Sequence, residues 1–182
     1  MPIILIMRVF SFIILMFLSS GLCAARLYAA PLERGYSLAP KVTASPEEKT
    51  QAYQYARGKV IEASRKYEGV PYRYGGTTIN GLDCSGFIGI CFKDALGVIL
   101  PRSASALYAW VERIPYEKAK AGDFLFFKTG ASGGITHVAL YLGERRFIHC
   151  ASSGSKTGVI YSNLDEDYWA ETYAGAGRAF PE

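Results

Sequence analysis

Residues 83–92 of the chain, DCSGFIGICF, combine a cysteine with the spacing of a buried helix. The large apolar residues recur at steps of three and four, which is typical of an α-helix with one buried face. Asp83 is a residue type that caps helix N-termini, and Gly97 is one at which helices end. We therefore predict a helix that begins beside Cys84 and ends before Gly97.

Cys84 is the residue of this stretch that could carry chemistry. Its side chain would lie at the helix N-terminus, whose partial positive charge stabilises a thiolate, so we expect a lowered pKa. Cys91 and Cys150 are the other cysteines beyond residue 25. An odd number of cysteines in an exported chain leaves at least one thiol free. If Cys91 and Cys150 formed a disulfide, the free thiol would be that of Cys84. Whether this disulfide forms stays open. The chain has no Cys-x-x-Cys pair and only two histidines, so we expect no metal and no cofactor.

A cysteine nucleophile needs an imidazole as its base and a third group that orients the imidazole. The two histidines, His137 and His149, stand in segments 135–142 and 146–150, which read as a β-hairpin. With a three-residue turn between the segments, Ala139 faces His149, so both histidines project from one face as diagonal neighbours. A slip of one residue would place them on opposite faces. The other face, expected in the core, carries Val138, Leu140, Leu142, Ile148 and Cys150.

The remaining segments predict an α+β fold. A capping box over 45–48 starts a helix that continues to about Tyr67. We expect a shorter helix over 104–111 and strands over 124–127 and 159–161. Helices first and strands afterwards favour helices packed on a central antiparallel β-sheet.

Residues 1–25 have the layout of a secretory signal peptide: one charge, Arg8, then an apolar run and small residues. A run of about ten residues is too short to cross a bilayer as a helix, so no membrane span is expected. A lipid anchor on Cys23 is an alternative, although Leu22 is bulky where such sites favour small residues. Residues 26–44 read as a linker. We expect export to the periplasm, the cell envelope or the outside of the cell.

The charge balance is mild. The formal net charge is +4, and removal of residues 1–25, with Arg8 as their one charge, lowers it to +3. This charge is compatible with an anionic polymer as partner but too weak to argue for nucleic acid. The sequence also lacks a basic cluster with interleaved aromatic residues, so we expect no nucleic-acid partner.

Asp83–Phe87 resembles the nucleophile motif of the NlpC-type cell-wall endopeptidases, a family of papain-like cysteine peptidases. Other segments resemble further parts of that family in the same order along the chain. The resemblance implies a papain-like NlpC-type domain over residues 45–182. The similar segments are Pro71–Gly76, Leu100–Ser103, Ala121–Phe127, Ile135–Gly143, Phe147–His149, Tyr168–Trp169 and Ala176–Arg178.

The resemblance implies a role for each candidate residue. Cys84 would attack the scissile carbonyl, His137 would act as its base and later as the acid for the leaving amine, and His149 would orient His137. Tyr72 matches a tyrosine of the family's active site that would help to hold the oxyanion, beside the backbone N–H of Cys84. The same cleft would also be lined by Asp83 and Ser85.

The resemblance also implies a substrate, the stem peptides of peptidoglycan. The expected reaction is hydrolysis of the bond between D-γ-glutamate and the following diamino acid by a Cys-His-His triad, in a monomer. Two alternatives stay open: an N-acetylmuramoyl-L-alanine amidase, as in the related CHAP-type domains, and a non-catalytic wall-binding domain with the same fold. Cys–His catalysis predicts a bell-shaped dependence of activity on pH.

Overall fold

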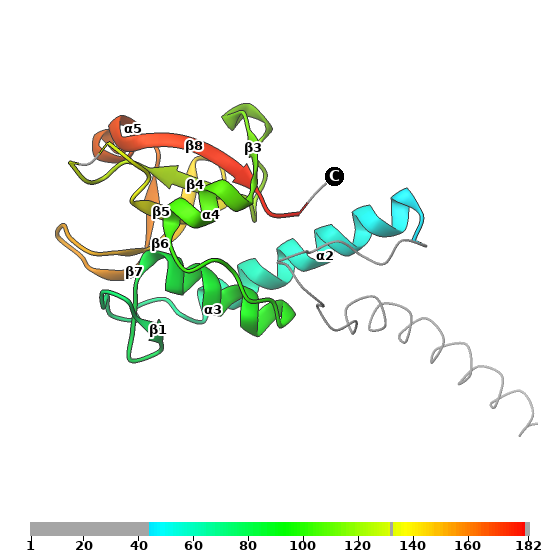
Figure 1. Ribbon diagram of the computed structural model, residues 1–182, viewed down its shortest axis with the longest axis horizontal. Helices are drawn as coiled ribbons and strands as arrows, with labels where there is room; N and C mark the ends of the chain where they lie inside the picture. Colours follow the sequence, from blue (N-terminus) through cyan, green and yellow to red (C-terminus); the bar gives the residue numbers. More distant parts are fainter. Residues whose placement is uncertain (1–43, 132, 181–182) are drawn as a thin grey trace, which may run out of the picture. The chain divides into compact units, whose positions relative to one another are not determined.

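The structure, a computed structural model, describes residues 44–131 and 133–180 (Figure 1). The predicted signal peptide over 1–25, the lipid anchor on Cys23 and nearly all of the linker over 26–44 lie outside the described residues. The chain divides into two compact units, 1–52 and 53–182, and every element discussed below in connection with the site belongs to the second.

The predicted capping box is present at the start of helix α2 (Pro46–Arg65). The Glu48 N–H donates to Ser45 Oγ at 3.2 Å, and the Ser45 N–H donates to Glu48 Oε2 at 2.7 Å. These reciprocal bonds satisfy two backbone donors that a helix start otherwise leaves unpaired. The helix ends at Arg65, two residues before the predicted end, and the chain continues in tighter turns as far as Val70.

Helix α3 (Cys84–Leu96) confirms the prediction made from residues 83–92. The Asp83 side chain accepts a hydrogen bond from the Gly86 N–H, and Gly97 ends the helix with a φ of 69°, a left-handed value that costs glycine little. The shorter predicted helix is α4 (Ala104–Trp110), and Ser103 caps it through a 3.1 Å bond from the Ala106 N–H.

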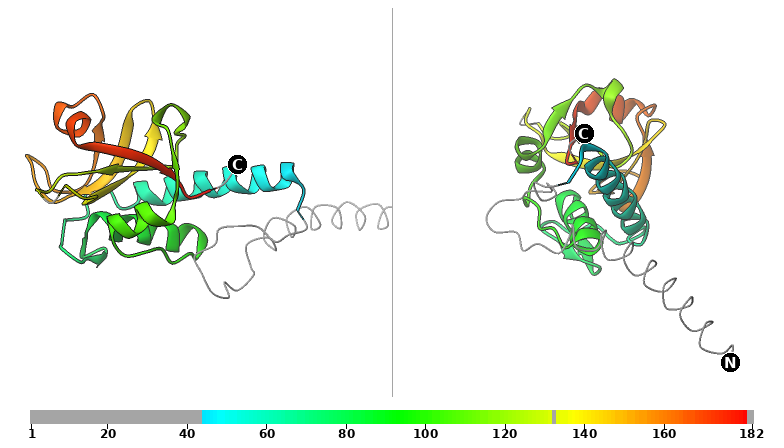
Figure 2. Two further views of the ribbon diagram at one scale, coloured as in Figure 1. Left: turned by 45° about the horizontal axis from the view of Figure 1, so that its top comes forward. Right: turned by 90° about the vertical axis from the view of Figure 1, so that its right-hand side faces the viewer.

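A six-stranded antiparallel sheet follows, in the order β3-β8-β4-β5-β6-β7. Helix α3 packs on one face of it, against β5 and β6 (Figure 2). The predicted α+β arrangement is therefore confirmed. The strands are β3 (Glu112–Ile114), β4 (Phe124–Phe127), β5 (His137–Gly143), β6 (Arg146–Ala151), β7 (Gly158–Asn163) and β8 (Tyr173–Arg178); β1 (Thr77–Thr78) and β2 (Gly81–Leu82) form a separate small hairpin, and η1 (Tyr116–Lys118) is one turn of 3₁₀-helix.

The register of the β5–β6 hairpin, on which the positions of the histidines depend, is the predicted one. Leu140 pairs with Ile148 and Tyr141 with Phe147. The turn differs, because Gly143 rather than Leu142 pairs with Arg146. Its central residues, Glu144 and Arg145, have φ values of 51° and 61°. Positive φ at both positions is the geometry of the two-residue turns that suit the twist of a hairpin.

Both faces of the sheet are buried, which corrects the expectation that only one of them is core. The face toward α3 carries Val138, Leu140, Ile148 and Cys150, all buried as predicted, whereas Leu142 on the same face is only partly buried. The face with the histidines is covered as well, because Trp169 of helix α5 (Asp167–Thr172) packs on it. The apolar cluster on this second face consists of Leu125, Phe127, Ala139, Tyr141, Phe147, Leu164 and Ala176.

Asp123 is a fully buried carboxylate that joins α2 to β8. Arg57 Nη1 donates to its Oδ1 at 2.6 Å, and Arg178 Nη2 donates to its Oδ2 at 3.0 Å. Arg57 also donates to Phe180 O at 3.1 Å, and Arg178 to Lys118 O at 2.6 Å. The cluster therefore ties the end of the chain and the turn before β4 to the first helix.

The disulfide left open between Cys91 and Cys150 is not formed: both are buried free thiols, as Cys84 is a free thiol. The Cys150 S–H donates to Leu82 O at 3.1 Å. Across residues 44–131 and 133–180, no helix has the length and apolar character needed to span a membrane.

Candidate active site

The thiol of Cys84, at the first turn of α3, lies against the start of strand β5. Its Sγ atom is 3.9 Å from Thr136 O, and the backbone N–H of Val138 also interacts with the sulfur. Peptide groups on both sides of His137 thus border the thiol. Within the described residues, the hydrogen bond of the thiol goes to Thr136 O rather than to the His137 ring. A hydrogen bond between a catalytic thiol and its base is often long before substrate binds and shortens when it does.

His137, His149 and Ser162 form a chain of hydrogen bonds. His137 Nε2 lies 2.9 Å from His149 Nδ1, and His149 Nε2 lies 3.2 Å from Ser162 Oγ. This pairing leaves Nδ1 of His137 as the ring nitrogen that can accept the thiol proton. If Nδ1 accepts, Nε2–H donates to His149, and His149 must then donate its own Nε2–H to Ser162.

Aromatic rings enclose the two histidines. The Trp169 ring centroid is 5.5 Å from that of His137 and 4.7 Å from that of His149, and the Phe147 ring is 5.2 Å from His149. His149 is fully buried. The packed rings hold both imidazoles in one orientation. Because they also exclude water, they strengthen the hydrogen bond between the two imidazoles.

Burial sets the charge state of the pair. It lowers the pKa of His137 from 6.5 to about 4. Burial, and then the charge on His137, lower the pKa of His149 well below 6.5. Both imidazoles are therefore neutral at pH 7, which is the state in which His137 can accept a proton.

The Cys84 thiol departs from the expectation of a lowered pKa. Burial raises its pKa, the negative charge of Asp83 raises it further, and the N–H groups of Val138, Ser85 and Cys84 oppose the shift. The helix N-terminus thus acts in the predicted direction but is outweighed by desolvation. In the resting protein the proton stays on the sulfur.

These shifts predict a loss of stability in mild acid. An unfolded histidine binds a proton near pH 6.5, whereas folded His137 does so only near pH 4. Between these values the unfolded state binds more protons, so the free energy of unfolding falls as the pH is lowered, by about 3 kcal/mol for His137. Urea unfolding at pH 7 and pH 4.5 measures the effect. A His137→Gln variant should show a flatter profile, and an equally steep one would contradict the assignment.

Asp83, Ser85 and Arg102 form a network around the turn before Cys84. Asp83 Oδ1 accepts from the Gly86 N–H at 2.6 Å, from Ser85 Oγ at 3.0 Å and from Arg102 Nη1 at 2.9 Å. Arg102 also donates to Ser85 Oγ at 2.7 Å and to Gly76 O at 3.2 Å. Burial pushes the pKa of Asp83 upward, but the bonds from Arg102, Gly86 and Ser85 outweigh it and bring the pKa below its usual value. The carboxylate is thus ionised and fixes the turn.

A cavity of about 510 Å³, here called the Cys84 cavity, opens at this network. Tyr72 lines it together with Cys84. Burial, then the neighbouring Cys84 and Asp83 side chains, raise the pKa of the Tyr72 phenol, so the phenol keeps its proton and can donate a hydrogen bond. The other polar residues that line the cavity are Tyr74, Asp83, Ser85, Arg102, Ser103, Ser105 and Thr136.

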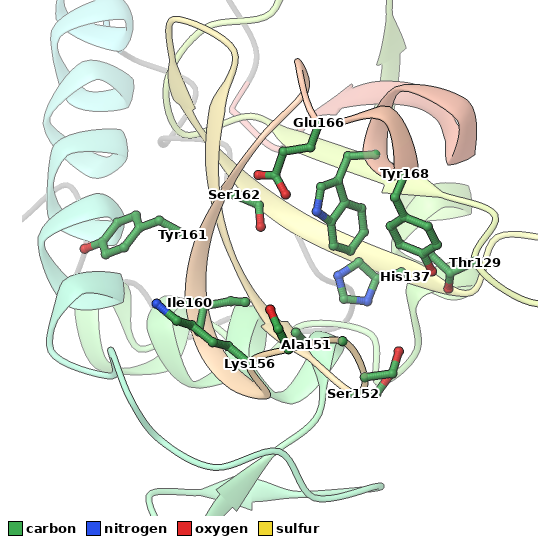
Figure 3. A pocket seen from close by; sticks show the side chains of 14 residues that line it. Thr129, His137, Ala151, Ser152, Lys156, Ile160, Tyr161, Ser162, Glu166 and Tyr168 are labelled. Atoms are coloured by element: carbon green, nitrogen blue, oxygen red, sulfur yellow. The ribbon is translucent and has the colours of Figure 1, made fainter.

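A second cavity, of about 550 Å³, lies on the histidine side and is here called the His137 cavity (Figure 3). His137, Ser162, Glu166 and Tyr168 line it, and Lys156 comes from the loop between β6 and β7. Within the described residues, no group of three histidine, cysteine, aspartate or glutamate side chains could hold a metal ion.

Comparison with known proteins agrees with this geometry. The sequence model of the NlpC/P60 family matches residues 69–178, which is more than half of the chain. The chain belongs to the NlpC/P60 family. The NlpC-type resemblance seen in the sequence is thereby confirmed.

Curated NlpC/P60 relatives include enzymes that are named for different specificities. The chain is 41% identical over 120 residues to the gamma-DL-glutamyl hydrolase of Bacillus subtilis (strain 168), an alignment that covers 65% of this chain and 28% of that protein. It is 34% identical over 122 residues to the murein DD-endopeptidase MepS/murein LD-carboxypeptidase of Escherichia coli (strain K12), covering 67% of this chain and 62% of that protein. The chain thus spans less than two thirds of the length of either relative.

Solved structures of the NlpC/P60 family share the fold. A lipoprotein-like NLP/P60 family protein from Staphylococcus aureus subsp. aureus Mu50 superimposes with a TM-score of 0.60 at 37% sequence identity, covering 70% of this chain and 42% of that chain. The papain-like NlpC-type fold expected from the sequence is therefore confirmed.

Three residues of this NlpC/P60 site were absent from the candidates named from the sequence: Arg102, Ser162 and Trp169. Arg102 stood in a segment similar to the family but had no role assigned. Ser162 lies one residue beyond the predicted strand 159–161 and pairs with Phe147 in the sheet. Extending the strand by alternation would have placed Ser162 on the histidine face.

Proposed function

We propose that this protein is a cysteine peptidase that hydrolyses peptidoglycan stem peptides at the bond between D-γ-glutamate and the diamino acid. One observation carries the proposal: the Cys84 thiol borders the peptide groups around His137, whose Nε2 lies 2.9 Å from His149 Nδ1. A cysteine, a base and a group that orients the base are the parts that such hydrolysis needs.

In the first half of the reaction, Cys84 Sγ bonds to the γ-carbonyl carbon while His137 Nδ1 takes the thiol proton. The oxyanion that forms would be stabilised by the backbone N–H of Cys84 and by the Tyr72 hydroxyl. The C–N bond then breaks, and His137 gives the proton to the leaving amine. The products of this half are a thioester on Cys84 and the free amine of the diamino acid.

In the second half, water attacks the thioester. His137 takes a proton from the water as the new C–O bond forms, and returns it to the sulfur as the C–S bond breaks. His149 holds His137 in the tautomer with hydrogen on Nε2 throughout, and Ser162 favours that arrangement by accepting the Nε2–H of His149.

The Cys84 cavity suits an acyl group that carries a carboxylate. The guanidinium of Arg102 is paired with the Asp83 carboxylate, which lines the same cavity, so the donors that the cavity offers to a ligand are the hydroxyl groups of Tyr72, Ser103 and Ser105. A γ-linked D-glutamyl residue keeps a free α-carboxylate, which matches these donors. The Bacillus subtilis relative is named as a gamma-DL-glutamyl hydrolase, which also supports this choice of bond.

Mass spectrometry of muropeptide products tests the proposal. Muropeptides that contain either diaminopimelate or lysine as the diamino acid are incubated with the wild-type protein and with Cys84→Ala. Fragments truncated after D-glutamate, produced by the wild type alone, are the expected result. Release of intact stems would indicate an amidase, and splitting of cross-linked dimers the DD-endopeptidase activity named for the Escherichia coli relative. Binding without any product would favour the non-catalytic wall-binding domain.

We further propose that residues 1–25 direct export, so that the domain acts in the cell envelope or outside the cell. The support is the signal-peptide pattern of the sequence together with relatives named for murein hydrolysis.

A further inference from the structure

The two cavities have no lining residue in common. Cys84 lines the Cys84 cavity and His137 lines the His137 cavity. In the proposed reaction the acyl part of the substrate becomes bonded to Cys84, whereas the leaving amine takes its proton from His137. The leaving group must therefore lie on the His137 side, where the cavity of about 550 Å³ is open to it.

The His137 cavity carries charges of both signs. Lys156, an exposed residue of the β6–β7 loop, supplies a cation, and Glu166 supplies an anion. Both side chains are seen at the cavity in Figure 3. A ligand that matches this pair carries an ammonium and a carboxylate at separate positions.

Glu166 is held in place by the protein itself. Its Oε1 accepts the Asn163 N–H at 2.7 Å, just before helix α5. A carboxylate has about four acceptor positions, so this bond orients the group and leaves capacity for an ammonium ligand. The anion is therefore positioned before the ligand arrives, which lowers the entropic cost of binding.

We propose that the His137 cavity is the binding site of the leaving diamino acid, and that Lys156 makes the protein favour diaminopimelate over lysine. Both diamino acids carry a side-chain amine that Glu166 can bind, but only diaminopimelate carries a second carboxylate beside that amine. The free α-carboxylate at the C-terminus is common to both tripeptide substrates, so a lysine substrate lacks only the side-chain carboxylate that Lys156 would pair with. This inference rests on the proposed function and adds to it the choice of diamino acid.

The test compares two tripeptides, L-Ala-γ-D-Glu-meso-diaminopimelate and L-Ala-γ-D-Glu-L-Lys, each free and linked to N-acetylmuramic acid. Values of kcat/KM are measured for the full chain. The wild type should favour the diaminopimelate substrate by about fivefold, the size expected for one partly exposed ion pair. Lys156→Met should remove this preference by slowing only the diaminopimelate substrate, and Lys156→Glu should reverse it.

Two further variants separate charge from structure. Glu166→Gln keeps an acceptor for the Asn163 N–H but removes the negative charge, so it should slow both substrates by a similar factor. Lys66→Met is the matched control, because Lys66 is an exposed lysine that does not line the cavity. It should leave both rates and their ratio unchanged.

The possible outcomes separate a failure of this inference from a failure of the proposed function on which it rests. Cleavage of both tripeptides with equal efficiency, or a preference that survives Lys156→Met, overturns the assignment of the His137 cavity. Either result leaves the proposed peptidase function standing. A ratio that changes as much in Lys66→Met as in Lys156→Met also overturns it. Failure to cleave either tripeptide in any form overturns the proposed bond, and this inference with it.

Discussion

Cys84→Ala and His137→Ala are each expected to lower kcat/KM for wall peptides by about 10⁴-fold or more, and the double variant is expected to be no slower than either single one. The reason is that thiol and imidazole act as one unit. Without His137 the thiol keeps its proton, because burial already raises its pKa. Without Cys84 the imidazole has no nucleophile to activate.

Initial rates with one purified muropeptide, measured for wild type, both single variants and the double variant, give the coupling directly. His149→Ala is the graded comparison, and a smaller loss of about 10²- to 10³-fold is expected because it orients the base without touching substrate. Circular dichroism shows whether each variant is folded. Losses that multiply in the double variant would mean that the two residues act independently, and the proposed mechanism would fail.

The β5–β6 hairpin is the part of the site that could best be predicted from the sequence. The apolar residues of segments 135–142 and 146–150 alternate, and alternation determines which side chains share a face. That pattern, together with an assumed three-residue turn, predicted the register of β5 and β6 and with it the common face of His137 and His149, although the turn itself differs. The helix bearing Cys84 was equally well determined, because Asp83 and Gly97 mark its two ends.

Strand β8 shows where sequence patterns fail. Its residues, YAGAGR, have little intrinsic preference for a strand. They form one because they pair with β3 on one side and β4 on the other. The small residues are needed because the neighbours leave no room for larger ones: a Cβ on Gly177 would lie 2.3 Å from Val111 Cγ2. The cover provided by Trp169 was missed for a related reason, since helix α5 has six residues and no periodic pattern. Both elements are defined by tertiary packing.

The prediction of a lowered pKa for Cys84 was wrong because it considered only the helix N-terminus and not the burial of the thiol. The helix N-terminus can be located in a sequence, but the depth at which the thiol is buried depends on the sheet that packs against it. The same holds for His137, whose pKa near 4 follows from burial under rings that come from distant segments.

Asp123→Ala is expected to lower the free energy of unfolding by about 3–5 kcal/mol, a far larger effect than that of an exposed carboxylate. Removal of Asp123 leaves the guanidinium groups of Arg57 and Arg178 buried without their counter-charge. Asp123→Asn should cost nearly as much, because the amide keeps one acceptor but no charge. Urea unfolding at pH 7 measures both variants, provided that the slope with urea concentration is unchanged.

Asp165→Ala is the matched control for this prediction. Asp165 also pairs with an arginine, Arg145, but the two side chains are 65% and 47% exposed. Water solvates each partner when the other is removed, so the loss should stay below about 1 kcal/mol. Similar losses in Asp123→Ala and Asp165→Ala would contradict the role given to the buried cluster. A large loss for Asp123 alone would instead mean that α2, the turn before β4 and strand β8 are held together by one carboxylate.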